Sequence, residues 1–373
     1  MHKVPRLHLD RYYDKIKEDF QERCGDMAKI MLAMSGGVDS SVAAYLLQNE
    51  GHSCLGATMI LCDSAATGSV ADAEAVANRL QIPFYIFDHT KDFAERVIGD
   101  FIRCYEEGGT PNPCVTCNKT VKFDVLLDRA LEMGCDYLAT GHYAQIRPGE
   151  NGRYLLYKAA DLQKDQSYFL ACLNQHQLSR SKFPLGEMTK EQVREIAEAQ
   201  GFVTAKKKDS QDICFIPDGD YKAFMERYTG KTYPGGNYLD MTGKVVGTHQ
   251  SAVGYTIGQR KGLGIALGEP AYVTGKNMAN NTVTLGRNED LYRTTLVATN
   301  WNFIPFEKLE EPLKVKARVR YRHTEQPATV YPMEDGCAKV VFDEPQRAIT
   351  TGQAIVLYDG DLVVGSGTIT EVL

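Results

Sequence analysis

The sequence predicts an α/β fold with an N-terminal parallel sheet wrapped by helices, a small central domain and a C-terminal β-barrel. Three observations support this prediction. Apolar strand-like runs alternate with amphipathic helical runs from about residue 29 to 146, the pattern of a parallel sheet covered by helices. Over 216–287 the chain is rich in glycine, tyrosine and threonine with turn signals. From about residue 288, polar and apolar residues alternate in short runs, which indicates a small barrel.

The first predicted strand, 30–34, leads into Ser35-Gly36-Gly37-Val38-Asp39-Ser40 and then into a predicted helix over 41–49. The two glycines lack a Cβ, so the backbone can approach a ligand closely with its N–H groups turned inward. The positive end of the helix faces the same point. This arrangement predicts a phosphate-binding loop at the carboxyl end of the strand, where open α/β sheets bind their ligands.

Further elements are expected in chain order after this loop. They are strands at 54–61, 84–87 and 137–140, and helices at 72–80, 92–105, 121–133 and 190–200. We expect an N-terminal extension at 1–27, the sheet domain at 28–215, the central domain at 216–287 and the barrel at 288–373. Met27 is a second candidate start, so the extension is expected to be dispensable for catalysis or not always translated.

The composition excludes several classes of protein. The chain has 373 residues, 43% of them hydrophobic, which is enough for two or three cores. Its net charge of -6 argues against a generally cationic nucleic-acid coat protein, so an RNA partner would have to meet a local basic patch. No apolar run is long enough for a membrane span or a signal peptide. We therefore expect a cytoplasmic protein whose ten cysteines are reduced thiols.

The loop lacks the lysine of a Walker motif, which argues against a kinase or GTPase. It resembles instead the SGGxDS signature of the PP-loop ATP pyrophosphatases. Enzymes of that class split ATP between its α and β phosphates and activate a carbonyl oxygen as an adenylate. A serine-glycine turn without a ligand is the alternative interpretation of the same residues.

Two cysteines have unusual surroundings. Cys117 follows the stiff Thr110-Pro111-Asn112-Pro113 segment, and a helix is expected to start just beyond Asn118. A helix entrance together with Lys119 and Lys122 predicts a lowered pKa and a nucleophilic thiol. Cys214 follows the run Lys206-Lys207-Lys208, whose charge would favour a thiolate or a persulfide. Seven further cysteines are interpreted as small buried hydrophobic residues: Cys24, Cys54, Cys62, Cys104, Cys135, Cys172 and Cys337.

Further motifs stand in a recognisable order along the chain. They are the loop, Pro111-Asn112-Pro113, Ala139-Thr140-Gly141-His142-Tyr143, Lys164-Asp165-Gln166-Ser167-Tyr168-Phe169-Leu170, the stretch 206–216 and Gly258-Gln259-Arg260-Lys261-Gly262-Leu263-Gly264. Together they closely resemble the bacterial tRNA-specific 2-thiouridylase (MnmA) family of PP-loop enzymes, from about residue 28 to the C-terminus. The loop alone does not separate this family from its PP-loop neighbours.

The resemblance implies a tRNA-uridine 2-sulfurtransferase. Such an enzyme thiolates the wobble uridine, position 34, by adenylating its C2 oxygen, and it releases AMP and pyrophosphate. Cys214 resembles the residue that carries the persulfide, and Cys117 resembles the nucleophile that attacks it and leaves a Cys117–Cys214 disulfide. The implied cofactors are ATP and Mg²⁺. The implied partners are tRNA and a sulfur donor, either a cysteine desulfurase or a sulfur-relay protein, with no membrane.

The resemblance also assigns binding residues. The positions that match ATP contacts are Ala33, Met34, Ser35, Gly36, Gly37, Val38, Asp39, Ser40, Met59 and Gly141. Those that match contacts with the target base are Asn112, Pro113 and Cys114. Those that match tRNA contacts are His142, Lys164, Asp165, Gln166, Arg320, Tyr321 and Gln353. Many relatives have Asp where this chain has Cys114, so an acid or base role of that carboxylate does not carry over.

Several alternatives remain open from the sequence. Cys114, Cys117 and Cys214 could ligate a [4Fe-4S] cluster through three thiolates. The chain could instead be an amide-forming PP-loop ligase, although no glutaminase segment is visible, or a non-catalytic tRNA- or nucleotide-binding protein. His142 could be a structural hydrogen-bonding histidine.

A basic strand is the best candidate for RNA binding. In 314–322, strand alternation places the cations on one face: Lys314, Lys316, Arg318, Arg320 and Arg322. Such a row suits a sugar-phosphate backbone. In a regular strand Tyr321 faces away from these cations, so its predicted tRNA contact requires a bulge or a strand end.

Overall fold

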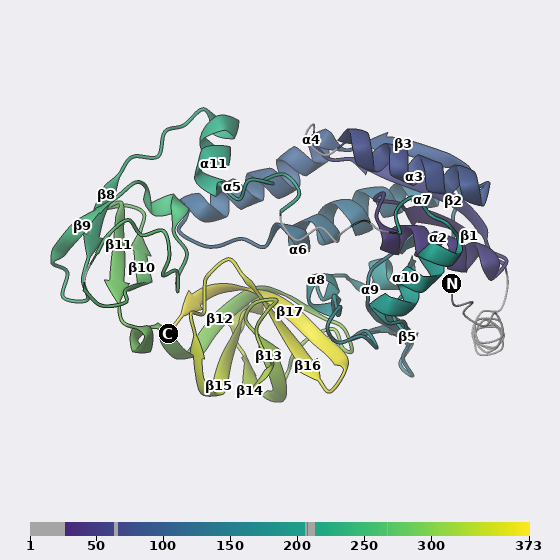
Figure 1. Ribbon diagram of the computed structural model, residues 1–373. Coiled ribbons are helices and arrows are strands. Elements are labelled where there is room, and N and C mark those ends of the chain that lie inside the picture. Colours follow the sequence, from purple (N-terminus) through teal and green to yellow (C-terminus); the bar gives the residue numbers. More distant parts are fainter. Residues whose placement is uncertain (1–26, 63–65, 206, 208–212, 267) are drawn as a thin grey trace, which may run out of the picture.

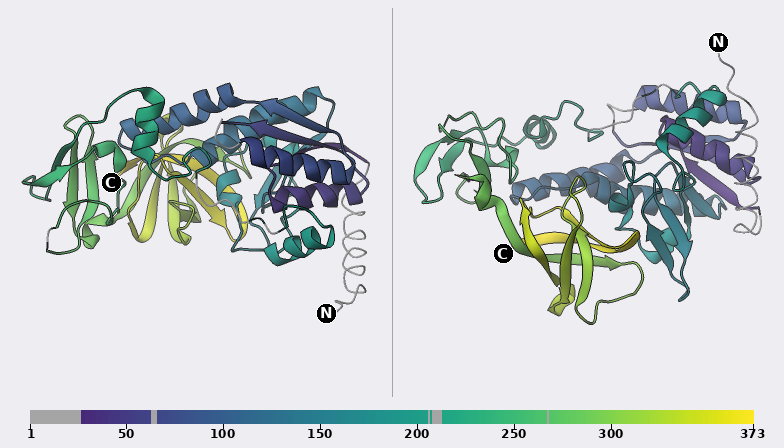
Figure 2. Two further views of the ribbon diagram at one scale, coloured as in Figure 1. Left: turned by 45° about the horizontal axis from the view of Figure 1, so that its top comes forward. Right: turned by 60° about the horizontal axis from the view of Figure 1, so that its bottom comes forward.

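The computed structural model describes residues 27–62, 66–205, 207, 213–266 and 268–373. The predicted N-terminal extension, apart from Met27, therefore lies outside the described residues. Figure 1 shows three bodies: a helix-covered sheet at one end, a small sheet at the other and a barrel below the long helices between them. Both views of Figure 2 show the same arrangement from other directions. Among the described helices, none is both long and apolar enough to cross a membrane.

The N-terminal sheet is parallel, with the strand order β3-β2-β1-β4-β7. Its strands are β1 (Lys29–Ala33), β2 (Ser53–Ile60), β3 (Phe84–Asp88), β4 (Tyr137–Thr140) and β7 (Ser181–Lys182). Ile30 of β1 pairs with Cys54 on one side and with Tyr137 on the other. The chain moves outward from β1 to β3 and then returns to the other side of β1. The ligand-binding switch point of such a sheet lies between β1 and β4.

Helices cover both faces of this sheet. They are α2 (Val38–Asn49), α3 (Ala66–Leu80), α7 (Leu126–Glu132), α8 (Ser167–Leu170), α9 (Gln175–Ser179) and α10 (Lys190–Ala199). Ile30 and Leu32 of β1 pack into the same core as α2, α3 and α10. Met31 points to the other face and packs with α7, α8 and the barrel residue Tyr358. Alternate residues of one strand thus serve two cores, which explains the continuous apolar run of β1.

Two composite helices run away from the sheet. One joins α4 (Thr90–Phe93), a π-helix (Ala94–Ile98) and α5 (Gly99–Glu106); the other joins α6 (Pro113–Cys117), a π-helix (Asn118–Val125) and α7. The second helix begins at Pro113 with Asn112 as its N-cap, whose Oδ1 accepts the Val115 N–H at 3.4 Å. The prediction of a helix start beyond Asn118 was wrong, because Pro113 occupies the first helical turn, where proline is tolerated.

The central domain is a four-stranded sheet in the order β10-β11-β8-β9. It follows α11 (Tyr221–Thr229) and consists of β8 (Gly236–Leu239), β9 (Val245–His249), β10 (Tyr272–Asn277) and β11 (Thr282–Gly286). Tyr238, Val273 and Val283 are fully buried in its core. Three short 3₁₀ turns complete this domain and the next, at Ala252–Gly254, Asn288–Leu291 and Glu334–Gly336.

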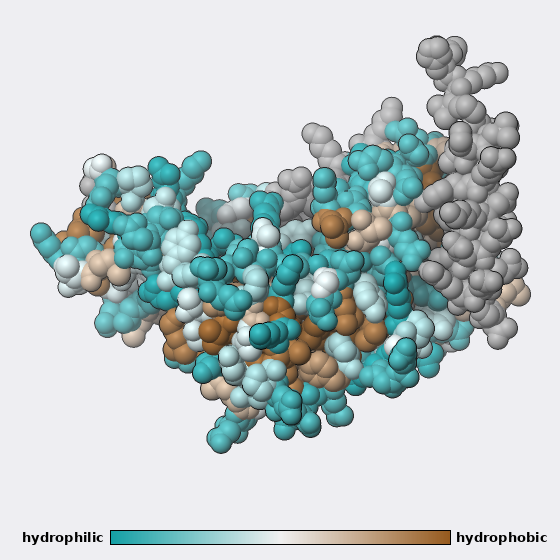
Figure 3. All heavy atoms as spheres, turned by 90° about the horizontal axis from the view of Figure 1, so that it is seen from below, coloured by the Kyte–Doolittle hydropathy of each residue, from teal (hydrophilic) through white to brown (hydrophobic). Residues whose placement is uncertain are grey.

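The C-terminal strands close into a barrel, as predicted. The order β12-β15-β14-β13-β16-β17 is closed by the pairing of β12 with β17, and β6 and β5 extend the sheet beyond β17. The strands are β5 (Gln145–Pro148), β6 (Tyr154–Tyr157), β12 (Tyr292–Phe303), β13 (Leu313–Arg318), β14 (Gln326–Pro332), β15 (Ala338–Arg347), β16 (Ala354–Asp359) and β17 (Leu362–Val372). Seen from below, apolar residues gather over the middle of the molecule among hydrophilic ones (Figure 3).

Candidate functional site

The predicted phosphate loop connects β1 to α2 at the switch point. Gly36 has φ +66, and a Cβ at this position would collide with the carbonyl oxygen of Ser69 in α3. The Ser40 hydroxyl accepts the Ser35 N–H at 3.2 Å and donates to the Gly37 carbonyl at 3.1 Å. Gly141 follows β4, and a Cβ there would lie 2.7 Å from the Ser40 nitrogen. The structure thus brings Gly141 against the loop, and the close approach explains why both Gly36 and Gly141 lack side chains.

The carboxylate of Asp39 is held by two residues that the sequence analysis missed. Lys190 Nζ lies 2.7 Å from Oδ1 and 2.8 Å from Oδ2, and the Tyr143 hydroxyl donates to Oδ1 at 2.8 Å. Lys190 is 5% exposed and occupies the first turn of α10. A cation is unfavourable at a helix N-terminus. A lysine directly after the N-cap Thr189 was therefore a sequence signal for a special role.

Lys207 also reaches the loop. Its Nζ donates to the Gly36 carbonyl at 2.9 Å and to Asp72 Oδ2 at 2.8 Å. The sequence analysis predicted that the lysine run 206–208 would favour a thiolate at Cys214. Lys206 and Lys208 lie outside the described residues, and Lys207 is turned to the phosphate loop instead.

The helix that carries Cys117 packs against the segment that carries Cys214. Cys117 and Val121 share a buried cluster with Phe215 and Ile216. Met59 and Cys62, near the carboxyl end of β2, pack against the same cluster. Two segments far apart in sequence therefore meet beside the edge of the sheet that bears the loop. None of the described cysteines forms a disulfide; Cys114 and Cys214 are exposed, and Cys117 is buried.

The predicted lowering of the Cys117 pKa is wrong for this state of the molecule. Burial raises the pKa of the Cys117 thiol, and the Lys122 amine offsets only part of that increase. Cys117 lies at the end of α6 and not at a helix entrance, so no helix N-terminus stabilises its thiolate. Surrounding protein and the neighbouring thiols, Cys117 first among them, raise the pKa of the Cys214 thiol from 9.0 to about 12.

We expect iodoacetamide to react slowly with Cys214 at pH 8. The raised pKa of the folded thiol leaves less thiolate at pH 8 than the unfolded chain has. As the pH rises above 9.0, the thiol of the unfolded chain loses its proton before the thiol of the folded chain does. Ionisation of Cys214 therefore lowers the stability of the fold as the pH rises toward about 12. The rate should be measured by mass spectrometry, with urea-unfolded protein as the control. Equal rates in the folded and unfolded protein would contradict the expected suppression.

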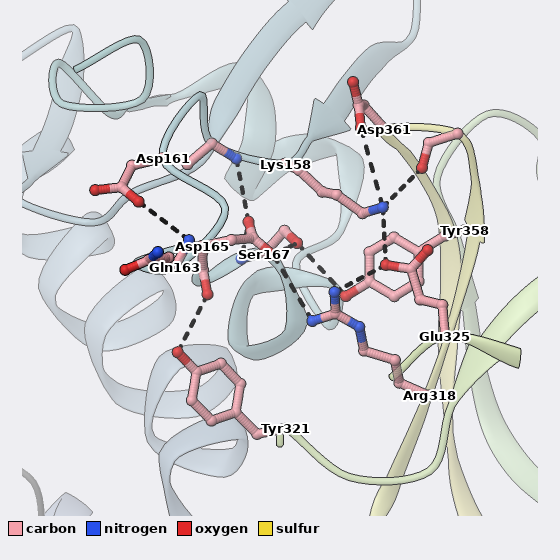
Figure 4. Close-up of polar contacts among 12 residues, drawn as sticks. Lys158, Asp161, Gln163, Asp165, Ser167, Arg318, Tyr321, Glu325, Tyr358 and Asp361 are labelled. Carbon is pink, nitrogen blue, oxygen red and sulfur yellow. Dashed lines mark hydrogen bonds and ion pairs between the residues drawn. The ribbon is translucent and has the colours of Figure 1, made fainter. Parts of the chain in front are cut away.

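Other predicted contact residues have internal roles in this structure (Figure 4). The Asp165 carboxylate is buried; its Oδ1 accepts the N–H groups of Ala159 and Ser167 at 3.1 Å each. The Tyr321 hydroxyl donates to the Asp165 carbonyl at 3.3 Å. Arg318 Nη1 lies 4.0 Å from Asp165 Oδ2 and links the barrel to this loop. Contacts of Asp165 and Tyr321 with tRNA stay predictions.

The remaining candidates are also placed. Gln166 Oε1 accepts the Tyr143 N–H at 3.0 Å, and Lys164 is half-buried beside it. The His142 ring lies against Phe123 and Phe183, and its Nδ1 is 2.7 Å from Thr140 Oγ1. Burial holds the pKa of His142 well below its usual value, so the ring is neutral. The structural interpretation of His142 is thereby supported, and its tRNA contact stays a prediction.

The predicted row of cations is shorter than expected. Lys314 and Lys316 are exposed on β13, but the strand ends at Arg318, whose Nη2 donates to Glu325 at 2.8 Å. The chain then turns, and the Tyr321 ring packs 4.4 Å from that of Phe169. The packing of Tyr321 ends the strand, although polar and apolar residues go on alternating in the sequence to residue 322. A strand end, one of the two alternatives, thus explains the orientation of Tyr321.

The three thiols of the iron-sulfur alternative are neighbours, since, besides burial, Cys117 and Cys114 both raise the pKa of the Cys214 thiol. Among the residues that the structure describes, no group of three His, Cys, Asp or Glu side chains is arranged to hold a metal ion. That arrangement concerns a single ion, so the [4Fe-4S] cluster on Cys114, Cys117 and Cys214 stays an untested alternative. We therefore draw no reaction step through one.

Comparisons with known proteins agree with the resemblance. Residues 28–218 match the family described as tRNA methyl transferase HUP domain, 222–287 the tRNA methyl transferase PRC-barrel domain and 293–369 the Aminomethyltransferase beta-barrel domain. A solved U34-tRNA thiolase NcsA from Methanococcus maripaludis, with its [4Fe-4S] cluster, is 18% identical and covers 58% of this chain and 74% of its own. Its TM-score of 0.38 is too low to carry an argument.

Curated relatives match over almost their whole length. The tRNA-specific 2-thiouridylase MnmA of Clostridioides difficile (strain 630) is 47% identical over 356 residues, which cover 92% of this chain and 99% of the relative. The protein of the same name from Acetivibrio thermocellus is 48% identical over 354 residues, which cover 91% of this chain and 99% of the relative. The chain therefore belongs to the tRNA-specific 2-thiouridylase family of PP-loop enzymes.

Proposed function

We propose that this enzyme replaces the C2 oxygen of the wobble uridine, position 34, of tRNA by sulfur, using ATP and releasing AMP and pyrophosphate. The observation that carries the proposal is the packing of Cys117 with Phe215 and Ile216 beside β2, next to the phosphate loop. This packing supports a shared site, in which the proposed nucleotide loop and the two thiols lie at one edge of the sheet. We further propose that the reaction takes place in the cytoplasm.

The activation step uses the loop. The N–H groups after Gly36 and the start of α2 would hold the ATP phosphates. The uridine O2 attacks the α phosphorus, and the bond to the β-phosphate oxygen breaks as pyrophosphate leaves. Mg²⁺, when bound, would neutralise phosphate charge, and the carboxylate of this loop that would hold it is Asp39, which is also paired with Lys190. Asn112, Pro113 and Cys114 would contact the base, which must leave its stack to be reached.

The sulfur step uses the two thiols. The terminal sulfur of a Cys214 persulfide attacks C2, and AMP leaves with the former C2 oxygen. The Cys117 thiolate then attacks Cys214 Sγ. The bond between Cys214 Sγ and the sulfur on C2 breaks, and its electron pair stays with that sulfur and forms the C2 thiocarbonyl. A Cys117–Cys214 disulfide remains and is reduced by an external dithiol. The persulfide itself comes from a cysteine desulfurase or a sulfur-relay protein.

The test supplies purified protein with unmodified tRNA, ATP and a persulfide donor. We expect pyrophosphate release that depends on tRNA, together with the mass gain of one sulfur-for-oxygen exchange in the anticodon loop. Amidation would give a different mass, and a binding protein would release no pyrophosphate. Anaerobic purification with iron and sulfide analysis tests the cluster alternative, because a stoichiometric cluster required for turnover would replace the persulfide scheme.

We expect Lys314 and Lys316 of the barrel to contact tRNA phosphates. Replacing both by glutamine should weaken tRNA binding and reduce the slope of log K against log salt by roughly 0.7–0.9 per lost contact. The measurement is a tRNA titration at several salt concentrations. Lys244→Gln, an exposed lysine of the central domain, is the matched control. An unchanged slope in the double variant would exclude this surface.

A further inference from the structure

The stretch 109–111 of the sheet domain is held by both of the other domains, the barrel and the central domain. It directly precedes Asn112, the N-cap of the helix that carries Cys114 and Cys117. From the barrel, Gln353 Nε2 donates to the Thr110 carbonyl at 2.9 Å and to the Pro111 carbonyl at 3.2 Å. The Thr110 N–H donates to the Thr351 carbonyl at 2.8 Å. From the central domain, Lys276 Nζ lies 3.4 Å from the Gly109 carbonyl and 2.8 Å from the Tyr255 carbonyl.

Two glycines allow this close junction. Gly352 has φ +85, and a Cβ there would collide with Cys104 Sγ and lie 3.1 Å from the Thr110 nitrogen. A Cβ on Gly109 would lie 2.7 Å from Cys104 Sγ and 3.1 Å from the Thr351 carbonyl. The backbones of the barrel loop and of the 109–111 stretch are therefore in direct contact, and a movement of one displaces the other.

Gln353 has a specific place in this junction. Thr110 and Pro111 belong to no helix or strand, so their carbonyls have no ladder partners. The half-buried Gln353 amide reaches both carbonyls with its nitrogen. An amide nitrogen has two N–H donors, and both are thereby engaged. Only the amide oxygen remains for a contact with RNA.

We infer that Gln353 is a positioning residue for sulfur transfer, through which the barrel sets the position of the helix that carries Cys117. The inference rests on the proposed function. In the proposed function the barrel holds the tRNA through Lys314 and Lys316. The Gln353 amide, which also belongs to the barrel, then fixes the position of the Cys117 thiol relative to the bound tRNA. A displacement of about 1 Å between reacting groups lowers a rate by roughly 100-fold.

Positioning and direct RNA contact predict different kinetics. A residue that contacts tRNA contributes to its affinity, whereas a positioning residue contributes to the rate of the bound complex. The experiment therefore uses full-length protein loaded with persulfide and measures two quantities at one salt concentration. These are the tRNA dissociation constant and the single-turnover rate of thiouridine formation at saturating tRNA.

The variants are Gln353→Leu, which removes the donors, and Gln353→Glu, which keeps the shape and places a carboxylate oxygen against the two carbonyls. We expect both to lower the single-turnover rate by roughly 10- to 100-fold, with the dissociation constant unchanged within about twofold. Lys244→Gln, at an exposed lysine of the central domain, is the control and should change neither the rate nor the dissociation constant. Circular dichroism and thermal unfolding identify any variant that fails to fold. If Gln353→Leu fails to fold, the rate and dissociation constant of Gln353→Glu test the inference.

Weaker tRNA binding with an unchanged single-turnover rate in the Gln353 variants would overturn the inference and assign Gln353 to direct contact. An unchanged rate with unchanged binding would also overturn it. Absence of thiouridine with the wild-type protein is a separate result, because it contradicts the proposed function and not the junction.

Discussion

Replacing Cys214 by serine is expected to lower thiouridine formation roughly 1,000-fold or more, as removal of a covalent nucleophile does elsewhere. A hydroxyl cannot carry a persulfide, so no sulfur reaches the uridine. The phosphate loop is unchanged, so tRNA-dependent pyrophosphate release should persist. Thiouridine is measured by mass spectrometry of digested tRNA. Cys337→Ser, on the barrel, is the matched control and should behave as the wild type.

Cys117→Ser is expected to stop the reaction one step later. The sulfur would already be bonded to C2 and still joined to Cys214, so a covalent protein–tRNA adduct should accumulate in the absence of reductant. Dithiothreitol should release that adduct as thiouridine. Normal product from both serine variants would refute the roles assigned to the two thiols. Product loss without an adduct in Cys117→Ser would refute the order of the steps.

Replacing Lys190 by methionine is expected to reduce pyrophosphate release at least about 100-fold and to lower the unfolding temperature. The Lys190 side chain is 6% exposed, and its ammonium group contacts both oxygens of Asp39. Breaking a buried ion pair costs about 3–5 kcal/mol, and the 30% exposure of the Asp39 side chain places the expected loss below that range. Pyrophosphate release and a thermal melt are the two measurements.

A second substitution separates the two effects of Lys190. In the pair Lys190→Met with Asp39→Asn, no unpaired carboxylate remains, so we expect most of the stability to return. Activity should stay low, because the loop has lost both charges beside the phosphates. Lys244→Met is the surface control. Recovery of activity together with stability in the double variant would show that the ion pair is only structural.

Local signals were sufficient for much of the fold. The strand 30–34, the loop and the following helix were predictable because glycine placement and apolar periodicity act over a few residues. The start of α6 was also readable, since Asn112 and Pro113 are typical N-cap and first-turn residues. The prediction placed that start too late and therefore assigned Cys117 a helix entrance and a low pKa.

Long-range contacts could not be predicted in the same way. Lys190 meets Asp39 across 151 positions, and Gln353 meets Thr110 across 243. No local pattern encodes such a pairing. The end of β13 at Arg318 could not be predicted for a related reason. The alternation of polar and apolar residues continues through Tyr321, but this side chain packs on Phe169 of the sheet domain. Tertiary burial decided the outcome against local periodicity.

The core shared by β1 and the barrel makes the two bodies one cooperative unit. Met31 of the sheet and Tyr358 of the barrel lie in a single buried cluster, and neither is accessible to water. If the barrel and the sheet domain were expressed separately, each would expose the apolar surface of this cluster and would bind chaperones or self-associate. Exchanging the whole barrel for another module therefore requires a matching change in the sheet domain.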